Sequence, residues 1–142
     1  MRTNKFSPVM RALAVCIGTL AFASGSYAAG DKTAYDSAKA SAKSTYEAAK
    51  AKCDALSGNA KDICVAEAKA ARTRTDEQAE AAYKNTPKAR EHAVHEIAEA
   101  DYKVAKERCD DKTGNTKDVC VADAKAAHAK ALADIKSTGT TH

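Results

Sequence analysis

Cysteine is the residue type in this chain best suited to covalent chemistry, and four of its five cysteines form two equally spaced pairs. Ten residues separate Cys53 from Cys64, and ten separate Cys109 from Cys120. A Gly-Asn dipeptide lies midway in each interval. If the chain reverses direction there, each pair reaches the Cα separation of about 5.5–6 Å that a disulfide needs. We therefore predict disulfides Cys53–Cys64 and Cys109–Cys120, whereas the other two connectivities would join the two halves of the chain.

Two other uses of these cysteines fit the spacing less well. A redox-active pair favours C-x-x-C at a helix N-terminus, and a zinc site favours tighter spacing or a histidine close by. Neither pattern occurs around the four cysteines. The sequence therefore favours structural disulfides, which persist in oxidising compartments.

A second cluster of chemically capable side chains lies at residues 91–99, with the sequence EHAVHEIAE. His92 and Glu96 are four residues apart, as are His95 and Glu99, so each pair shares one face of a helix. Imidazole and carboxylate groups can bind Zn²⁺ or Cu²⁺, which makes these four residues candidate metal ligands. His128 is a further candidate if the chain folds back on itself. The order H-x-x-H-E matches no zincin motif, and an exposed helix face with ordinary ion pairs is the competing interpretation.

The elements that would position these residues occur twice. Residues 46–71 and 102–127 align with an offset of 56, and 16 of the 26 aligned positions are identical. Self-similarity of this kind indicates an internal duplication, in which each unit buries little apolar surface alone. We therefore expect the two units to pack together or against a partner.

Each unit is predicted to be a helix, a tight turn and a second helix. The segments flanking the turn are rich in Ala, Lys and Glu, which favour helix. We expect Gly58 and Gly114 in the left-handed conformation at helix ends, with Asn59 and Asn115 capping the helices that follow. Thr86 and Pro87 suit the cap and first position of a third helix. The predicted helices span residues 32–55, 60–84, 87–111 and 116–136.

Small apolar residues recur along these helices at coiled-coil-like spacing. The first helix carries the stripe Tyr35, Ala38, Ala42, Tyr46, Ala49, Cys53 and Leu56, and the fourth carries Cys120, Ala124, Ala127, Ala131 and Ile135. An alanine-lined seam lets helices approach closely but buries little surface. We predict an all-α fold of two tandem disulfide-stapled antiparallel hairpins, elongated or loosely bundled.

The first 28 residues have the pattern of a secretory signal peptide. Three basic residues precede or adjoin an apolar run over 12–23, which is shorter than the about 20 residues that span a bilayer. Ser26 and Ala28 are small residues at positions −3 and −1 of a cleavage site. An uncleaved anchor and lipidation at Cys16 are weaker alternatives. The predicted organisation is a signal peptide at 1–28, hairpin repeats at 29–85 and 86–136, and a disordered tail at 137–142.

Charge argues against nucleic acid as a partner. The whole chain has a formal net charge of +4. Removing Arg2, Lys5 and Arg11 leaves 20 basic against 19 acidic residues, a net charge of +1. A nucleic-acid-binding protein needs clustered, uncompensated Lys and Arg. Here acidic and basic residues alternate, as on solvated helix faces.

The signal peptide, the run AAKAKC at residues 48–53 and the run CVAEAKAA at residues 64–71 together carry a resemblance to known proteins. The chain resembles small proteobacterial exported proteins that are often labelled TolA-like or cell-envelope biogenesis proteins. This resemblance is one of composition and extends over residues 31–136. It implies helicity and a location in the cell envelope, and it carries over no functional residue.

These features predict a non-enzymatic periplasmic or secreted helical repeat protein. We expect no cofactor, because the sequence has no catalytic motif or phosphate-binding glycine loop. The expected partner is a protein or another cell-envelope component, with self-association left open and no transmembrane segment after signal cleavage. The alternative function is metal binding or metal stress, through His92, His95, Glu96 and Glu99.

Overall fold

The computed structural model describes residues 30–139, which form four α-helices. These are α1 (Lys32–Cys53), α2 (Gly58–Lys84), α3 (Pro87–Asp110) and α4 (Gly114–Gly139). The predicted all-α fold of two disulfide-stapled hairpins is confirmed. α4 continues to Gly139, so the first three residues of the predicted tail are helical. The predicted signal peptide and residues 140–142 lie outside the described residues.

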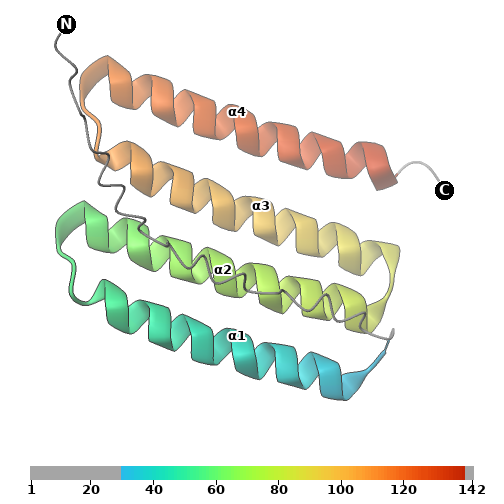
Figure 1. Cartoon of the computed structure of the whole chain (residues 1–142). Helices are drawn as coiled ribbons and strands as arrows, with labels where there is room; N and C mark the ends of the chain where they lie inside the picture. Colours follow the sequence, from blue (N-terminus) through green and yellow to red (C-terminus); the bar gives the residue numbers. More distant parts are fainter. Residues whose placement is uncertain (1–29, 140–142) are drawn as a thin grey trace, which may run out of the picture.

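The four helices lie side by side in a single layer, in chain order (Figure 1). Within residues 30–139, each helix contacts only the helices that precede and follow it in the chain. α1 and α4 therefore form the two edges of the layer, and α2 and α3 form its middle (Figure 1). Two-layer packing normally covers the apolar side of such an array. Within the described residues, no second layer covers either broad side.

Local capping explains where three of the helices begin or end. Asp31 accepts a hydrogen bond from the backbone N–H of Ala34 at the start of α1. Thr86 accepts from the N–H of Ala89 at 3.1 Å, with Pro87 as the first residue of α3, as predicted. α2 ends at Lys84 and is capped by Asn85, whose φ of 45° is left-handed, a conformation that asparagine tolerates.

The turn glycines adopt the predicted conformation at a different place in the helices. φ is +56° at Gly58 and +54° at Gly114, but these residues begin α2 and α4 rather than end α1 and α3. The predicted caps at Asn59 and Asn115 are wrong, because both lie inside the first turn. The Nδ2 of Asn59 instead donates to the backbone carbonyl of Glu107 on α3, at 3.0 Å.

Alanine dominates the residues that the helices bury. Among the described residues, the buried apolar side chains are eight alanines with Cys53, Cys109, Val104 and Ile135, and only the two cysteines are fully buried. The predicted stripe on α1 faces α2 except at its end, where Leu56 is 43% exposed in the turn. On α4, Ala127 is exposed and His128 takes the inward position instead.

Candidate functional site

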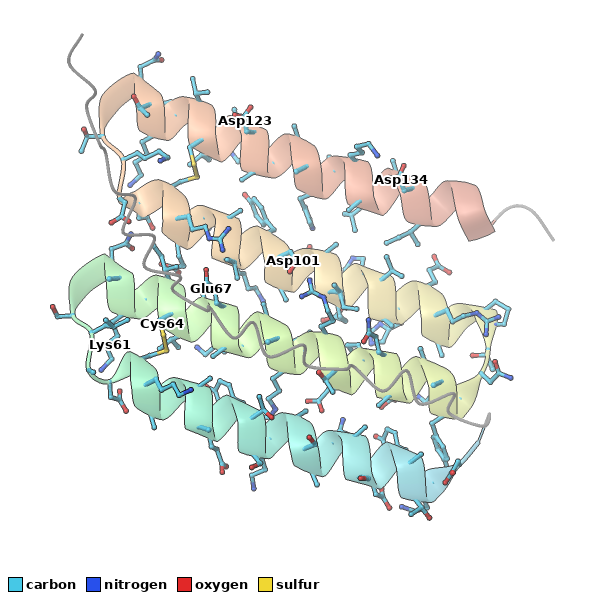
Figure 2. The ribbon with its side chains drawn as sticks, viewed as in Figure 1. Lys61, Cys64, Glu67, Asp101, Asp123 and Asp134 are labelled. Atoms are coloured by element: carbon cyan, nitrogen blue, oxygen red, sulfur yellow. A yellow bond between two sulfur atoms is a disulfide. The ribbon has the colours of Figure 1, made fainter. Side chains whose placement is uncertain are left out.

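The two disulfides have nearly the same geometry. Cys53–Cys64 and Cys109–Cys120 each join Cα atoms 5.6 Å apart, across turns of equal length. In Figure 2 the bond at Cys64 lies near the turn between α1 and α2. The predicted pairing is therefore confirmed. Stable disulfides are compatible with an exported protein, and no helix of residues 30–139 is long and apolar enough to cross a membrane.

A lysine–aspartate pair also bridges each turn. Lys61 lies 3.0 Å from Asp54, and Lys117, 56 residues later, lies 2.7 Å from Asp110. The hydrogen bond from Lys61 and its positive charge lower the pKa of the Asp54 carboxyl. The two hairpins thus repeat their turns in structure as well as in sequence.

The predicted His/Glu cluster does not converge on one point. His92 faces Glu77 of α2 at 3.9 Å, and His95 contacts its neighbour Glu96 at 3.4 Å. Glu99 points to the other side of α3, where it lies 2.8 Å from the Nε2 of His128. In the part of the chain that the structure describes, no three His, Cys, Asp or Glu side chains are arranged to hold a metal ion.

Three members of that cluster border an open hollow between α3 and α4. The hollow has a volume of about 550 Å³ and is lined by His92, His95 and Glu96, with Lys88, Glu91, Leu132 and Ile135. At the same place in the first hairpin, the rings of Tyr35 and Tyr83 stack 5.0 Å apart. The residues 56 positions later are Glu91 and Gly139, which form no such ring pair.

A large hollow lies over α2, on one broad side of the layer. It measures about 660 Å³ and takes residues from three helices, including Tyr46 of α1, Asp76 of α2 and Lys103 of α3. Arg72 lies 3.3 Å from Asp76 and 5.5 Å from the centre of the Tyr46 ring. Tyrosine and arginine are the residue types most enriched at protein interfaces.

Asp76 is a closely confined charge in this hollow. Its side chain is 16% exposed and has Lys39 of α1 at 4.0 Å as a second cation. Its Oδ1 atom is buried without a hydrogen bond. Sequence reasoning missed this cluster, although the four-residue spacing of Arg72 and Asp76 is a signal for a shared helix face.

The other broad side of the layer carries paired charges between α2 and α3. Arg108 donates to Glu67 at 2.6 Å, and Arg74 donates to both oxygens of Asp101. These four residues border a smaller hollow of about 310 Å³. Figure 2 labels Glu67 and Asp101 on the facing sides of the two helices. Their charges are compensated within the chain, so this side offers less to a charged partner.

A largely covered histidine, His128, joins α3 to α4. The ring of His128 stacks on that of Tyr102 at 4.9 Å, and its side chain is 17% exposed. In the first hairpin the corresponding positions hold Tyr46 and Arg72, which also contact each other. Both hairpins therefore place a planar side chain against the tyrosine ring at this position, a guanidinium in the first and an imidazole in the second.

Comparisons with protein-family models, curated proteins and solved structures found no match to this chain.

Proposed function

We propose that this protein is a non-enzymatic helical repeat protein of the periplasm that acts by binding another protein of the cell envelope. The observation that carries the proposal is the single layer of helices, whose middle members α2 and α3 have no second layer from residues 30–139 over them. Such a layer presents a broad, rigid surface in proportion to its small size. Disulfides hold that surface in shape without a large core.

The binding side in this proposal is the one with the hollow over α2. Tyr46, Val65 and Ala66 supply apolar surface there, and Arg72, Asp76 and Lys103 supply both signs of charge. This mixture suits a protein partner with apolar anchors and a polar rim. It suits nucleic acid poorly, because the acidic residues offset the basic ones.

Export to the periplasm rests on the signal-peptide pattern and on the disulfides. We expect the mature chain to begin at Ala29, because Ser26 and Ala28 satisfy the cleavage rule. Intact-mass measurement of protein from the periplasmic fraction tests this. A mass that includes Met1, or a lipid on Cys16, would contradict it.

A site-specific crosslinking experiment tests the binding side. A photo-reactive amino acid replaces Lys69, which borders the large hollow, or Ala71, which borders the smaller hollow on the other side. Residues two positions apart on a helix lie roughly 200° apart around its axis, so positions 69 and 71 lie at nearly the same height on α2 and on opposite sides of it. We expect an adduct with one envelope protein from position 69 and not from position 71.

A charge variant makes that test specific. Arg72→Glu reverses the charge beside Asp76, and we expect it to abolish the adduct at position 69 while the disulfides and the helical signal persist. Equal adducts from positions 69 and 71, or an adduct unaffected by Arg72→Glu, would rule out the proposed surface.

A further inference from the structure

Acidic residues followed seven residues later by a basic one occur on all four helices, including Asp36 and Lys43 on α1. Three such sets lie on related sides of their helices: Glu67 and Arg74 on α2, Asp101 and Arg108 on α3, and Asp123 and Lys130 on α4. Seven residues make nearly two helical turns, so both charges of each set lie on one side of their helix. This side is therefore marked by one negative and one positive charge about 10 Å apart along the axis.

The sets on α2 and α3 satisfy each other. These two helices are antiparallel, so the acid of one meets the base of the other. The two pairs are Glu67–Arg108 at 2.6 Å and Arg74–Asp101 at 2.7 Å. These two ion pairs therefore join the facing sides of α2 and α3 in one register.

The set on α4 lies on the open edge of the layer. The offset of 56 relates α4 to α2, so the side of α4 that corresponds to the α3-facing side of α2 has none of the other three described helices against it. We call this side the α4 edge; it consists of Val119, Ala122, Asp123, Ala126, Lys130 and Ala133. Asp123 is labelled on the outermost helix in Figure 2.

All six residues of the α4 edge are exposed. Val119 is 51% exposed, whereas its counterpart Ile63 on α2 is partly covered. The side chain of Lys130 is 76% exposed, and its ion-pair partner in the described part of the chain is the carboxylate of Asp134, on its own helix, at 2.8 Å. Alanines fill the space between the charges, and small residues allow a second helix to approach closely.

The opposite edge of the layer does not complement the α4 edge. The residues of α1 that correspond to Asp101 and Arg108 are Thr45 and Lys52, so the acid is missing. Ser41 and Ala48 of α1 replace Ile97 and Val104 of α3, which makes the edge more polar. A terminal unit with a polar outer face is how repeat arrays end. Head-to-tail stacking would therefore keep one ion pair and lose the apolar contacts.

A second copy of α4 complements the α4 edge fully. We propose that two copies of this protein form a symmetric dimer in which their α4 helices pack antiparallel along the α4 edge. A twofold axis between Ala126 and Ala127 brings Asp123 of each copy to Lys130 of the other, because the two residues are equidistant from that point. The interface is isologous, so it closes at two copies and does not propagate.

This arrangement repeats the two ion pairs of the α2–α3 interface between identical partners. The axis is perpendicular to the layer, so the same broad sides of both copies face the same way and the dimer is a layer of eight helices. The α4 edge and the hollow over α2 are separate, and dimerisation leaves the hollow open. The inference therefore goes beyond the proposed function and stands or falls separately from it.

Charge exchange on the oxidised protein tests the dimer. Sedimentation and light scattering over a concentration series measure the association of wild type, and we expect a monomer–dimer equilibrium. In the Asp123→Lys dimer, positions 123 and 130 are both lysine, so each contact between the copies joins two lysines. In the Lys130→Asp dimer, each of these contacts joins two aspartates. We expect each variant to weaken dimerisation at least tenfold without changing the helical signal or the disulfides.

Two recovery experiments give the test its specificity. An equal mixture of Asp123→Lys and Lys130→Asp should form heterodimers, and the double variant with both exchanges should dimerise like wild type. The matched control for Lys130→Asp is Lys125→Asp, which makes the same charge reversal at an exposed position on another side of α4. It should leave dimerisation unchanged.

Each contrary result overturns the inference. A wild-type chain that stays monomeric across the series excludes the dimer. Single variants that dimerise normally show that the contact lies elsewhere, and so does a mixture that fails to form heterodimers. None of these results bears on crosslinking at position 69, which tests the function proposed above.

Discussion

Arg74 and Asp101, which are 27 residues apart in the chain, join the two hairpins by a shared hydrogen bond. One guanidinium nitrogen of Arg74 donates to both carboxylate oxygens of Asp101, at 2.8 and 2.7 Å. Among residues 30–139, and apart from the linker at Asn85 and Thr86, the hairpins are connected through contacts between α2 and α3. This pair and Glu67–Arg108 therefore lie at the contact that sets the register of the layer.

The first prediction concerns the energy of that pair. Both side chains are about half exposed, so we expect a coupling energy of about 0.2–1 kcal/mol, the range for solvent-exposed ion pairs. Arg74→Asp and Asp101→Arg should each destabilise the fold, and the double exchange should recover part of the loss. Denaturant unfolding of the four proteins measures the coupling. Additive effects of the two single exchanges would show that the pair does not set the register.

The second prediction concerns the turn glycines. A Cβ atom built at Gly58 or Gly114 meets nothing within 4 Å, so only the positive φ opposes a side chain there. We expect Gly58→Ala to cost about 1 kcal/mol and Gly58→Val more, because β-branched residues tolerate positive φ worst. Ser57→Ala is the matched control, since Ser57 makes no side-chain capping bond. Thermal unfolding measures the difference, and equal midpoints would contradict it.

Local sequence signals were sufficient for much of this fold. Helix propensity and the interruptions at Gly58 and Gly114 placed four helices, and equal distance from the turn paired the cysteines correctly. These features depend on residues close in sequence. The predicted cap at Asn59 failed because its amide finds a better partner in a distant helix, at Glu107.

The arrangement in a layer and the candidate surface required three-dimensional information. Alanine seams tolerate several rotations of a helix, so spacing alone could not choose between Ala127 and His128 on α4. The ring of Tyr102 and the carboxylate of Glu99 decide for His128. The hollow over α2 draws residues from three helices, and their meeting depends on the α2–α3 register.

The third prediction concerns metal binding. His92 and Glu99 point to different helices, so the predicted ligand set is divided between opposite sides of α3. We expect calorimetric titration of the purified oxidised protein with Zn²⁺ or Cu²⁺ to show no binding tighter than roughly 10 μM, since a specific site needs three or four converging ligands. Tighter binding that His92→Ala and His95→Ala together abolish would revive the metal hypothesis.

The fourth prediction concerns acid stability. A hydrogen bond from Lys84 lowers the pKa of the Glu80 carboxyl, and a hydrogen bond from Tyr35 at 3.1 Å adds to it, against the opposing effect of burial. A carboxyl with a lowered pKa stabilises the fold above its ordinary pKa, and this stabilisation is lost as pH falls through the lowered value. Glu80→Gln should therefore reduce stability at pH 6 more than at pH 3. Glu47→Gln on α1 controls for the loss of one charge, and parallel stability–pH curves for wild type and Glu80→Gln would contradict the prediction.

The last prediction follows from the small core. Eight alanines make up most of the buried apolar residues between 30 and 139, and the only fully buried side chains are those of Cys53 and Cys109. Burying one methyl group contributes about 0.8 kcal/mol, so these seams hold the helices weakly. Each disulfide closes a short loop and contributes about 3 kcal/mol in the chain-entropy model, which is large against a net stability of about 5–15 kcal/mol.

We expect reduction to lower the thermal midpoint by at least about 10 °C, because 1 kcal/mol shifts it by roughly 4–8 °C in a domain of this size. Part of the helical signal should persist, since alanine favours helix without tertiary contacts. Circular dichroism of oxidised and reduced protein measures both quantities, and the paired variants Cys53→Ala/Cys64→Ala and Cys109→Ala/Cys120→Ala separate the two bonds. An unchanged midpoint after complete reduction would mean that the alanine seams alone hold the layer together.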